Sequence, residues 1–150
     1  MMSDYTWHLP DPATQPEFYA DVALKRLIAF VVDTAVIVVL CLLTAVVTAG
    51  MSLFVFPIMM AVIGYAYRVV TLTRASATWG MRLMAIEFRD ASGARFDLRL
   101  AALHTLGLTI SFAIPFVQVA SVVLMLTTAR GQGLSDQVLG TVAINRPANR

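Results

Sequence analysis

The sequence has 150 residues, of which 59% are hydrophobic and 13% charged, and its mean hydropathy is +0.77. Soluble domains are typically about 45–50% apolar, and one this small leaves about a third of its unfolded-chain surface exposed, so the composition excludes a soluble domain and makes the lipid bilayer the expected partner. The formal net charge is +2, and the sequence has no run of basic residues with aromatic residues between them. This excludes a nucleic-acid-binding protein.

The first half of the chain predicts a tail followed by two membrane spans. Residues 1–21 are polar, acidic and proline-containing, which predicts a flexible cytoplasmic tail. Leu27–Ala49 and Met51–Leu72 are apolar stretches joined by a tight, uncharged turn at Gly50. Each has about the 20 residues that a helix needs to cross a hydrocarbon core of about 30 Å. We therefore expect two long transmembrane helices.

In the segment after the second span, apolar residues recur at every second position. Apolar residues alternate with small or charged ones from Met84 through Phe88, with Glu87 on the polar face, and Asp90–Gly93 is a turn signal. The alternation then resumes. This pattern predicts a short cytoplasmic β-hairpin over Met84–Leu98, with its apolar face against the membrane surface.

Leu98–Thr128 is apolar again and is broken by Pro115. It is too long for one upright span and short for two, so a tilted span preceded by an interfacial helix and a re-entrant hairpin bent near Pro115 both fit. A strand-like segment, Thr141–Ile144, precedes a C-terminal tail over 145–150. The predicted fold over 22–144 is an all-α membrane protein: a small bundle of two long transmembrane helices plus a Pro-broken third and fourth helical segment, with the short β-hairpin.

Basic residues are distributed asymmetrically along the chain. The turn between the two spans has none, whereas Lys25 and Arg26 precede the first span, and six arginines from Arg68 to Arg99 lie at the end of the second span and in the middle loop. By the positive-inside rule, the N-terminus and the middle loop are cytoplasmic, and the arginines near the C-terminus favour a cytoplasmic C-terminus as well. Tyr67 is expected to be an interface anchor, and Arg68 to reach the headgroups along its own stem.

Asp33 is the most informative residue of the first span, because an aspartate at mid-membrane is unfavourable by about 2.5–3.5 kcal/mol. Arg26, seven residues earlier, shares its face but lies about 10 Å away along the axis, so a cation from another element or a water is a more plausible partner. Thr44 and Thr48 continue roughly the same face, which suggests a polar stripe turned toward protein. Two interpretations stay open: an ion or proton path, and a polar clamp between helices.

His104 and Gln118 are further polar residues in apolar surroundings. A lone membrane histidine more often hydrogen-bonds a neighbour than binds a metal, and the chain has only two histidines, without liganding spacing, so we expect no metal and no cofactor. The single cysteine, Cys41, implies no disulfide. No recognisable nucleophile motif is present, so we do not expect an enzyme.

Four motifs, taken in order, resemble the RDD family of bacterial membrane proteins, which is named for one arginine and two aspartates. The motifs are Arg26 with Asp33, Thr78–Leu83, Asp90–Gly93 and Leu134–Thr141. The resemblance implies that Arg26, Asp33 and Asp136 are the defining residues, with Gly80 and Arg82 of the second motif in support. It also implies a multi-pass protein of the bacterial inner membrane.

Two positions depart from the family's usual pattern. A lysine commonly precedes the arginine at position 82, where this chain has Met81, and a histidine often precedes the last aspartate, where it has Ser135. The resemblance implies transport of an unidentified ligand, with cation/proton exchange proposed for some members. Both departures remove potential charge near the cytoplasmic face, which argues against a proton-coupled role here.

Two functional hypotheses follow. The first is a transport-related protein that works as a homo-oligomer, because so few helices rarely enclose a pathway alone; Asp33 would bind a cation or proton, with Arg26 tuning it. The alternative is an accessory or assembly subunit of a larger membrane complex, in which the charges are purely architectural. Under both, unpaired charges are costly, so we expect Asp136 to approach Arg26 or Arg82 within salt-bridge reach.

Overall fold

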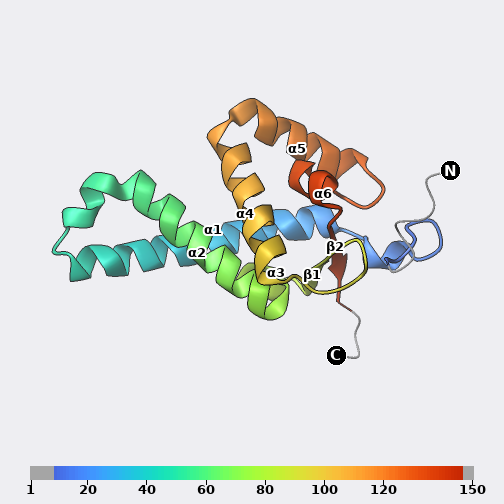
Figure 1. Cartoon of the computed structure of the whole chain (residues 1–150), viewed down its shortest axis with the longest axis horizontal. Helices are drawn as coiled ribbons and strands as arrows, with labels where there is room; N and C mark the ends of the chain where they lie inside the picture. Colours follow the sequence, from blue (N-terminus) through green and yellow to red (C-terminus); the bar gives the residue numbers. More distant parts are fainter. Residues whose placement is uncertain (1–8, 147–150) are drawn as a thin grey trace.

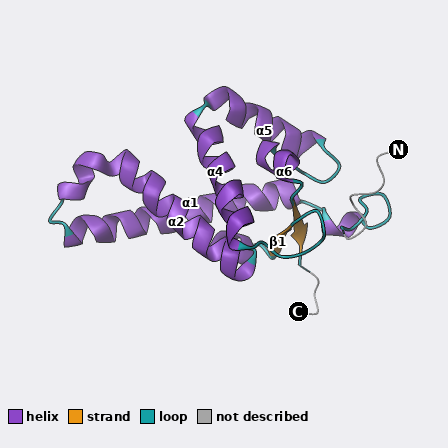
Figure 2. Ribbon diagram, viewed as in Figure 1, coloured by secondary structure: helices purple, strands orange, loops and turns teal. Residues whose placement is uncertain are grey.

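The computed structural model describes residues 9–146 and is mostly helical (Figure 1). In chain order the elements are η1 (Pro16–Phe18), α1 (Val22–Val47), η2 (Met51–Val55), α2 (Phe56–Ala75), α3 (Trp79–Leu83), β1 (Ile86–Arg89), α4 (Leu98–Ala113), α5 (Pro115–Thr127), α6 (Leu134–Leu139) and β2 (Val142–Asn145). The two strands form one small sheet near the start of α1 (Figure 2).

Helices α1 and α2 form a long hairpin that carries the two predicted spans (Figure 1). Pro16–Val47 and Met51–Ala75 are both long and apolar enough to cross a membrane. Gly50 makes the turn between them at φ +85°, a conformation that glycine adopts readily. Pro57 lies in the first turn of α2, where its missing N–H removes no helical hydrogen bond. The two predicted long helices are confirmed.

The outer faces of this hairpin match a lipid environment. Ile37 and Cys41 of α1 pack with Met59 and Tyr67 of α2, whereas many other large apolar residues of both helices are exposed. Phe54, between the two helices, is 91% exposed. A soluble protein rarely exposes contiguous apolar surface on this scale. The two helices therefore bury one narrow seam and leave the rest of their surface for lipid.

The predicted break at Pro115 is present. The chain bends by 119° between α4 and α5. Together the two helices form a third candidate span or a re-entrant loop. Ile114, the residue before the proline, is extended at φ −121° and ψ 98°, because the proline ring disfavours a helical conformation there. Figure 1 shows that α5 folds back toward the start of α1, so the chain returns to the end where it began.

The predicted local hairpin over Met84–Leu98 is wrong. Strand β1 pairs antiparallel with β2 from the C-terminal end, with Phe88 opposite Ala143. The turn at Asp90–Gly93 exists, but the chain after it does not return along β1. Ser76 Oγ accepts the backbone N–H of Phe96 (3.0 Å) and donates to the carbonyl of Phe88 (2.7 Å). The Ser76 hydroxyl, at the end of α2, thus bonds to the chain before and after the loop. The segment after the loop does not pair with β1, and β2 pairs with β1 instead.

Burial along β1 also differs from the predicted alternation. Ile86, Glu87 and Phe88 are all buried, because the strand lies within the core rather than on a surface. Glu87, expected on a polar face, is 1% exposed and is paired with Arg89 and with Arg146, whose Nε lies 3.3 Å from Glu87 Oε2. The burial of β1, with a tertiary ion pair between Glu87 and Arg146, thus reverses the exposure that the local pattern suggests.

Both described ends of the chain are held against the sheet. Asn145 Nδ2 donates to the carbonyl oxygens of Glu17 (2.8 Å) and Ala20 (2.9 Å), and Tyr19 Oη donates to the carbonyl of Pro10 (2.7 Å). These contacts fix the positions of some residues within 9–21, although most of that range is exposed. Asn145 is the last residue of β2, and the backbone N–H of Arg146 donates to the Ala85 carbonyl (2.8 Å). The rest of the two predicted tails, 1–8 and 147–150, lies outside the described residues.

Candidate functional site

Asp33 is the centre of a polar cluster that joins three helices. It lies on α1, is 1% exposed, and accepts hydrogen bonds from Tyr67 Oη (2.7 Å), Thr78 Oγ1 (2.5 Å) and the backbone N–H of Gly80 (2.9 Å). Thr78 is also the N-cap of α3, since its hydroxyl accepts the N–H of Met81 (3.2 Å). The carboxylate therefore fastens α2 and the start of α3 onto α1.

Gly80 allows α3 to approach α1 closely enough for this contact. A Cβ added at Gly80 would lie 2.2 Å from the carbonyl oxygen of Ala29 and 2.9 Å from its carbonyl carbon. These are backbone atoms, so they cannot move aside as a flexible side chain can. The glycine of the Thr78–Leu83 motif is thus required by packing against α1.

The cation nearest Asp33 comes from α2 and not from its own helix. Arg68 Nη1 lies 3.8 Å from Asp33 Oδ2, and the Arg68 guanidinium sits 5.3 Å from the centre of the Phe30 ring. Within the described residues the guanidinium makes no hydrogen bond. Tyr67 and Arg68 are therefore not the interface anchor and snorkelling cation that the sequence suggested. Instead they supply the partner from another element that Asp33 was expected to need.

Asp136 is the centre of a second cluster, and the expected contact with Arg26 is present. Arg26 Nη1 donates to Asp136 Oδ2 (2.6 Å), and the N–H of Gly133 donates to the same oxygen (3.0 Å). His104 Nε2 lies 2.8 Å from Asp136 Oδ1, which also accepts the Thr141 hydroxyl at 2.8 Å. Both oxygens of this fully buried carboxylate thus have two partners, drawn from α1, α4 and the C-terminal segment.

The surroundings of Asp136 favour its charged form. Burial alone would raise the pKa of Asp136, but the Arg26 guanidinium and the His104 hydrogen bond outweigh burial and hold this pKa well below its usual range. Arg26 also donates to the carbonyl of Gly131 (3.1 Å) and lies 5.2 Å from the centre of the Phe88 ring. The arginine is therefore anchored on several sides at the start of α1.

Three of the predicted supporting residues do not join either cluster. Arg82 is exposed on α3, so of the two cations proposed for Asp136 only Arg26 reaches it. Thr44 Oγ1 donates to the Leu40 carbonyl (2.9 Å) and Thr48 Oγ1 to the Thr44 carbonyl (2.9 Å). These threonines bond within α1, and the predicted polar stripe does not extend the Asp33 cluster.

Between the two clusters lies a cavity of about 480 Å³, which we call the inter-helix cavity. Its apolar walls come from α1, α2, α4 and α5. Both clusters reach it, through Arg26 and His104 on one side and through Asp33 and Arg68 on the other. The residues that line it include Leu27, Phe30, Leu72, Met81, Phe88, Leu108, Phe112, Val122, Met125 and Leu126. Such an apolar cavity with a few converging polar groups is the usual form of a ligand site.

Two residues that line the inter-helix cavity each carry a buried polar atom without a partner among the described residues. Thr105 Oγ1 on α4 and Gln118 Oε1 on α5 are buried and have no hydrogen-bond partner among the described residues. Thr105 as a whole is 1% exposed. A buried polar atom without a partner costs about 1–3 kcal/mol, so native proteins rarely leave one unsatisfied. These two atoms distinguish the cavity from ordinary loose packing.

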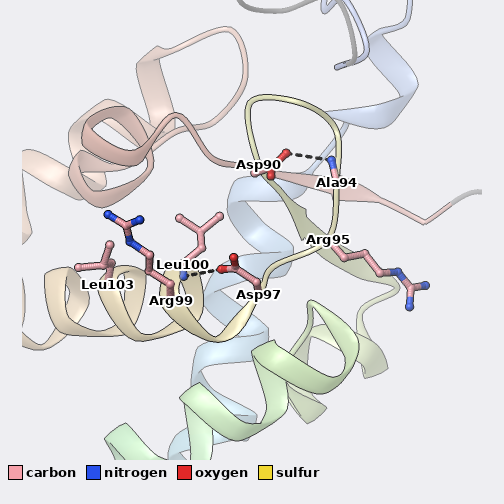
Figure 3. A pocket seen from close by; sticks show the side chains of 7 residues that line it. All are labelled: Asp90, Ala94, Arg95, Asp97, Arg99, Leu100 and Leu103. Carbon is pink, nitrogen blue, oxygen red and sulfur yellow. Dashed lines mark hydrogen bonds between the residues drawn. The ribbon is translucent and has the colours of Figure 1, made fainter.

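A second hollow, of about 420 Å³, lies beside the loop between β1 and α4. Figure 3 shows that the Arg95 and Arg99 side chains point in opposite directions, and that Asp90 and Asp97 do not face a common point. Each of these carboxylates accepts a backbone N–H of its own loop or helix start, at 2.9 and 2.8 Å. The groups around this hollow do not converge, so it is a weaker candidate for a site.

Within residues 9–146, no three His, Cys, Asp or Glu side chains are grouped so that they could hold a metal ion. The sequence did not identify Tyr67, Arg68, Thr105 and Thr141 as site residues. A usable signal existed for Tyr67 and Arg68, because they are adjacent polar residues near the C-terminal end of the second span. Thr141 ends the Leu134–Thr141 motif. Thr105 carries no local signal, because threonines occur throughout the apolar helices.

One of three comparisons with known proteins finds a match. A search of curated proteins and of solved structures finds no match to the chain. The family model of the RDD family matches residues 21–140, a range that contains Arg26, Asp33 and Asp136 and extends from the residue before α1 to the residue after α6. The chain therefore belongs to the RDD family.

Proposed function

We propose that this protein is a multi-pass inner-membrane protein that takes part in the transport of a ligand held in the inter-helix cavity. The observation that carries the proposal is the pair of orphaned polar atoms, Thr105 Oγ1 and Gln118 Oε1, in the wall of a cavity that also receives Arg68. A ligand that reached either atom after a rotation of its side chain would satisfy that atom and remove the cost of leaving it unpaired.

Cation or proton exchange at the carboxylates is less well supported. Asp33 accepts three hydrogen bonds and has Arg68 nearby, and Asp136 has four partners including Arg26. A metal cation at either carboxylate would have to displace donors and sit close to a guanidinium. The contacts favour the clamp interpretation of both aspartates, with the cavity beside them as the working part.

The orientation proposed is one with both termini and the β1–α4 loop in the cytoplasm. The basic residues before α1 and in the middle loop support it, as does the contact of Asn145 with Glu17 and Ala20, which keeps the two described ends together. A Ser92→Cys variant, in a Cys41→Ala background, tests it. The introduced cysteine should react with an impermeant thiol reagent only after the membrane is opened. Labelling in intact cells would refute the orientation.

An efflux assay tests the transport function. Vesicles containing the purified protein are loaded with a bacterial small-molecule extract, and released compounds are identified by mass spectrometry. We expect at least one class of compound to leave only vesicles that contain the protein. Val122→Trp, which fills the inter-helix cavity from α5, should block this release. Val123→Trp is the matched control, because Val123 is equally apolar, is 52% exposed and does not line the cavity.

Two outcomes would count against the proposal. Equal release by Val122→Trp and wild type would separate transport from the cavity. A pH-sensitive dye in the same vesicles, with an imposed sodium or potassium gradient, measures cation/proton exchange. Exchange that Asp33→Asn abolishes, in a variant that still folds, would restore the ion-path interpretation.

Assembly with other chains is the second candidate role. Two or three spans enclose little space, so we propose a homo-oligomer. The alternative is an accessory subunit of a larger complex. Asp33 and Asp136 already have hydrogen-bond partners within the chain, as residues with a purely structural role would. Mass measurement of the protein in lipid nanodiscs distinguishes these arrangements. A homo-oligomer gives a multiple of the chain mass, whereas a monomer that shows no release of any compound favours the accessory role.

A further inference from the structure

We infer that the ligand of the inter-helix cavity is a single-chain amphiphile with an anionic head group, which enters from the surrounding lipid. This inference deepens the proposed function, because it assigns a chemical class to the ligand of the same cavity. It depends on three observations: the rim of the cavity, the state of the Arg68 guanidinium, and the two orphaned polar atoms.

The rim of the cavity opens toward lipid. Leu24 and Leu27 of α1 and Leu126 of α5 all line the cavity, yet they are 57%, 60% and 70% exposed. Side chains that are exposed and also line a cavity mark its entrance. In a membrane protein an entrance framed by leucines on two lipid-facing helices admits a hydrocarbon chain more readily than a hydrated solute.

The polar end of the cavity presents a cation with unused donors. The Arg68 side chain is 13% exposed, and its closest acidic group, Asp33, already accepts three hydrogen bonds from uncharged donors. At 3.8 Å the Arg68–Asp33 contact is an ion pair without a hydrogen bond. A guanidinium offers five N–H donors in a planar fork that matches a carboxylate or a phosphate. Arg68 therefore has donors available for an anionic head group.

The position of Arg26 differs from that of Arg68, although both line the cavity. Arg26 Nη1 donates to Asp136 at 2.6 Å and to the Gly131 carbonyl at 3.1 Å, so the charge of Arg26 is already paired with a carboxylate through a direct hydrogen bond. Asp136 in turn has four partners. Because the Arg26–Asp136 pair is compact and closed, the attraction for an anion is concentrated at Arg68.

The orphaned atoms supply the rest of the recognition. Once their side chains rotate toward the cavity, the Thr105 hydroxyl can donate to a head-group oxygen, and Gln118 Oε1 can accept from a protonated or hydroxylated part of the ligand. Phe30 and Phe112 stack at 5.0 Å beside Arg68 and close the wall there. We place the hydrocarbon chain of the ligand along Leu108, Val122 and Leu126, with its head group at Arg68. In this position the chain contacts the apolar wall and the head group meets the cation.

Photocrosslinking tests this assignment. The protein is placed in nanodiscs of phosphatidylcholine and incubated with palmitic acid that carries a diazirine in its chain; crosslinked peptides are then identified by mass spectrometry. We expect crosslinks on α4 and α5 at the cavity. Unlabelled palmitic acid should compete, whereas its methyl ester and acetate should compete at least about tenfold more weakly, because they lack the charged head or the chain.

Variants link the binding to the named residues. Arg68→Gln should weaken competition by palmitic acid about tenfold or more but leave that by the ester unchanged. It should still fold, because Asp33 keeps three other donors. Thr105→Val and Gln118→Leu should each weaken binding about three- to tenfold. Thr109→Val, one turn along α4 with its hydroxyl bonded to the Thr105 carbonyl, should have no effect.

Each alternative occupant gives a distinct result. Equal competition by the methyl ester would mean that the cavity takes any lipid chain, and equal competition by acetate would mean a site for a small free anion; either result overturns the inference. Crosslinks confined to other helices overturn it as well. If palmitic acid binds specifically but no compound is released from loaded vesicles, the inference about the ligand stands and the transport proposal is refuted. If unrelated compounds are released and palmitic acid does not bind, the transport proposal stands and the inference about the ligand is refuted.

Discussion

Replacing Asp136 by leucine tests how the C-terminal segment is held to the membrane helices. The carboxylate has four partners, at 2.6, 2.8, 2.8 and 3.0 Å, and is 0% exposed. Leucine removes the acceptor for all of them and leaves the Arg26 guanidinium buried without its counter-charge. Breaking a buried ion pair in this way costs about 3–5 kcal/mol. Proteins are typically stable by about 5–15 kcal/mol, so Asp136→Leu should lower folding strongly.

The asparagine variant separates shape from charge. In Asp136→Asn the amide oxygen can face Arg26 and Gly133, while the amide N–H groups can donate to His104 and to the Thr141 hydroxyl. The hydrogen bonds then become neutral at this position; a bond to a charged group contributes about 1.5–3 kcal/mol and a neutral one about 0.5–1.5 kcal/mol, so the loss is about 1 kcal/mol for each bond that keeps its partner. We therefore expect the free energy of unfolding to fall in the order wild type, asparagine variant, leucine variant.

A double-mutant cycle measures the coupling directly. Denaturant unfolding in mixed lipid–detergent micelles is followed for Arg26→Met, Asp136→Leu and the double variant. The double variant should be less destabilised than the sum of the single ones by about 0.5–3 kcal/mol, because it contains no unpaired buried charge. Thr141→Val, which removes one neutral hydrogen bond, should cost about 1 kcal/mol. Strict additivity, or a loss for Asp136→Leu below that of Thr141→Val, would refute the reasoning.

Three further predictions follow from the same contacts. Gly80→Ala should destabilise the fold by about 1–3 kcal/mol in denaturant unfolding, since its Cβ would lie 2.2 Å from the Ala29 carbonyl oxygen, whereas Gly64→Ala, with its nearest atom at 3.5 Å, should not. Asp33→Asn should keep protein levels in the membrane much closer to wild type than Asp33→Leu; equal levels would contradict the clamp. Because the pKa of Asp136 is lower in the folded than in the unfolded protein, the unfolded state binds more protons, and thermal stability should fall from about pH 5 to about pH 3, less steeply in Asp136→Asn.

The sequence predicts those parts of the fold that depend on local composition. The two spans follow from the length of their apolar runs, and the bend follows from Pro115, whose ring constrains the residue before it. The contact of Asp136 with Arg26 follows from the high cost of an unpaired charge in apolar surroundings. In each case the physical cause lies within a few residues or in the residue type itself.

The strand pairing could not be predicted in this way. The alternation around Ile86 and the turn at Asp90–Gly93 suit a local hairpin, but the pairing depends on Ser76 at the end of α2, whose hydroxyl bonds both sides of the loop. The partner strand β2 is more than 50 residues away in the sequence. Likewise, Tyr67 and Arg68 look like interface residues until the crossing of α1 and α2 brings them to Asp33.

The three charged residues that the family resemblance implied as defining, Arg26, Asp33 and Asp136, have a common physical explanation in the structure. Arg26 and Asp33 are seven residues apart, so they share one face of α1 and are separated by about 10 Å. Each reaches a different cluster: Arg26 holds the C-terminal segment through Asp136, and Asp33 holds α2 and α3. Helix α1 is therefore the element on which the two halves of the chain close, and the inter-helix cavity is the space that remains between its two anchor points. A ligand at Arg68 would contact the Asp33 cluster directly, so the same charges that define the fold also border the proposed binding site.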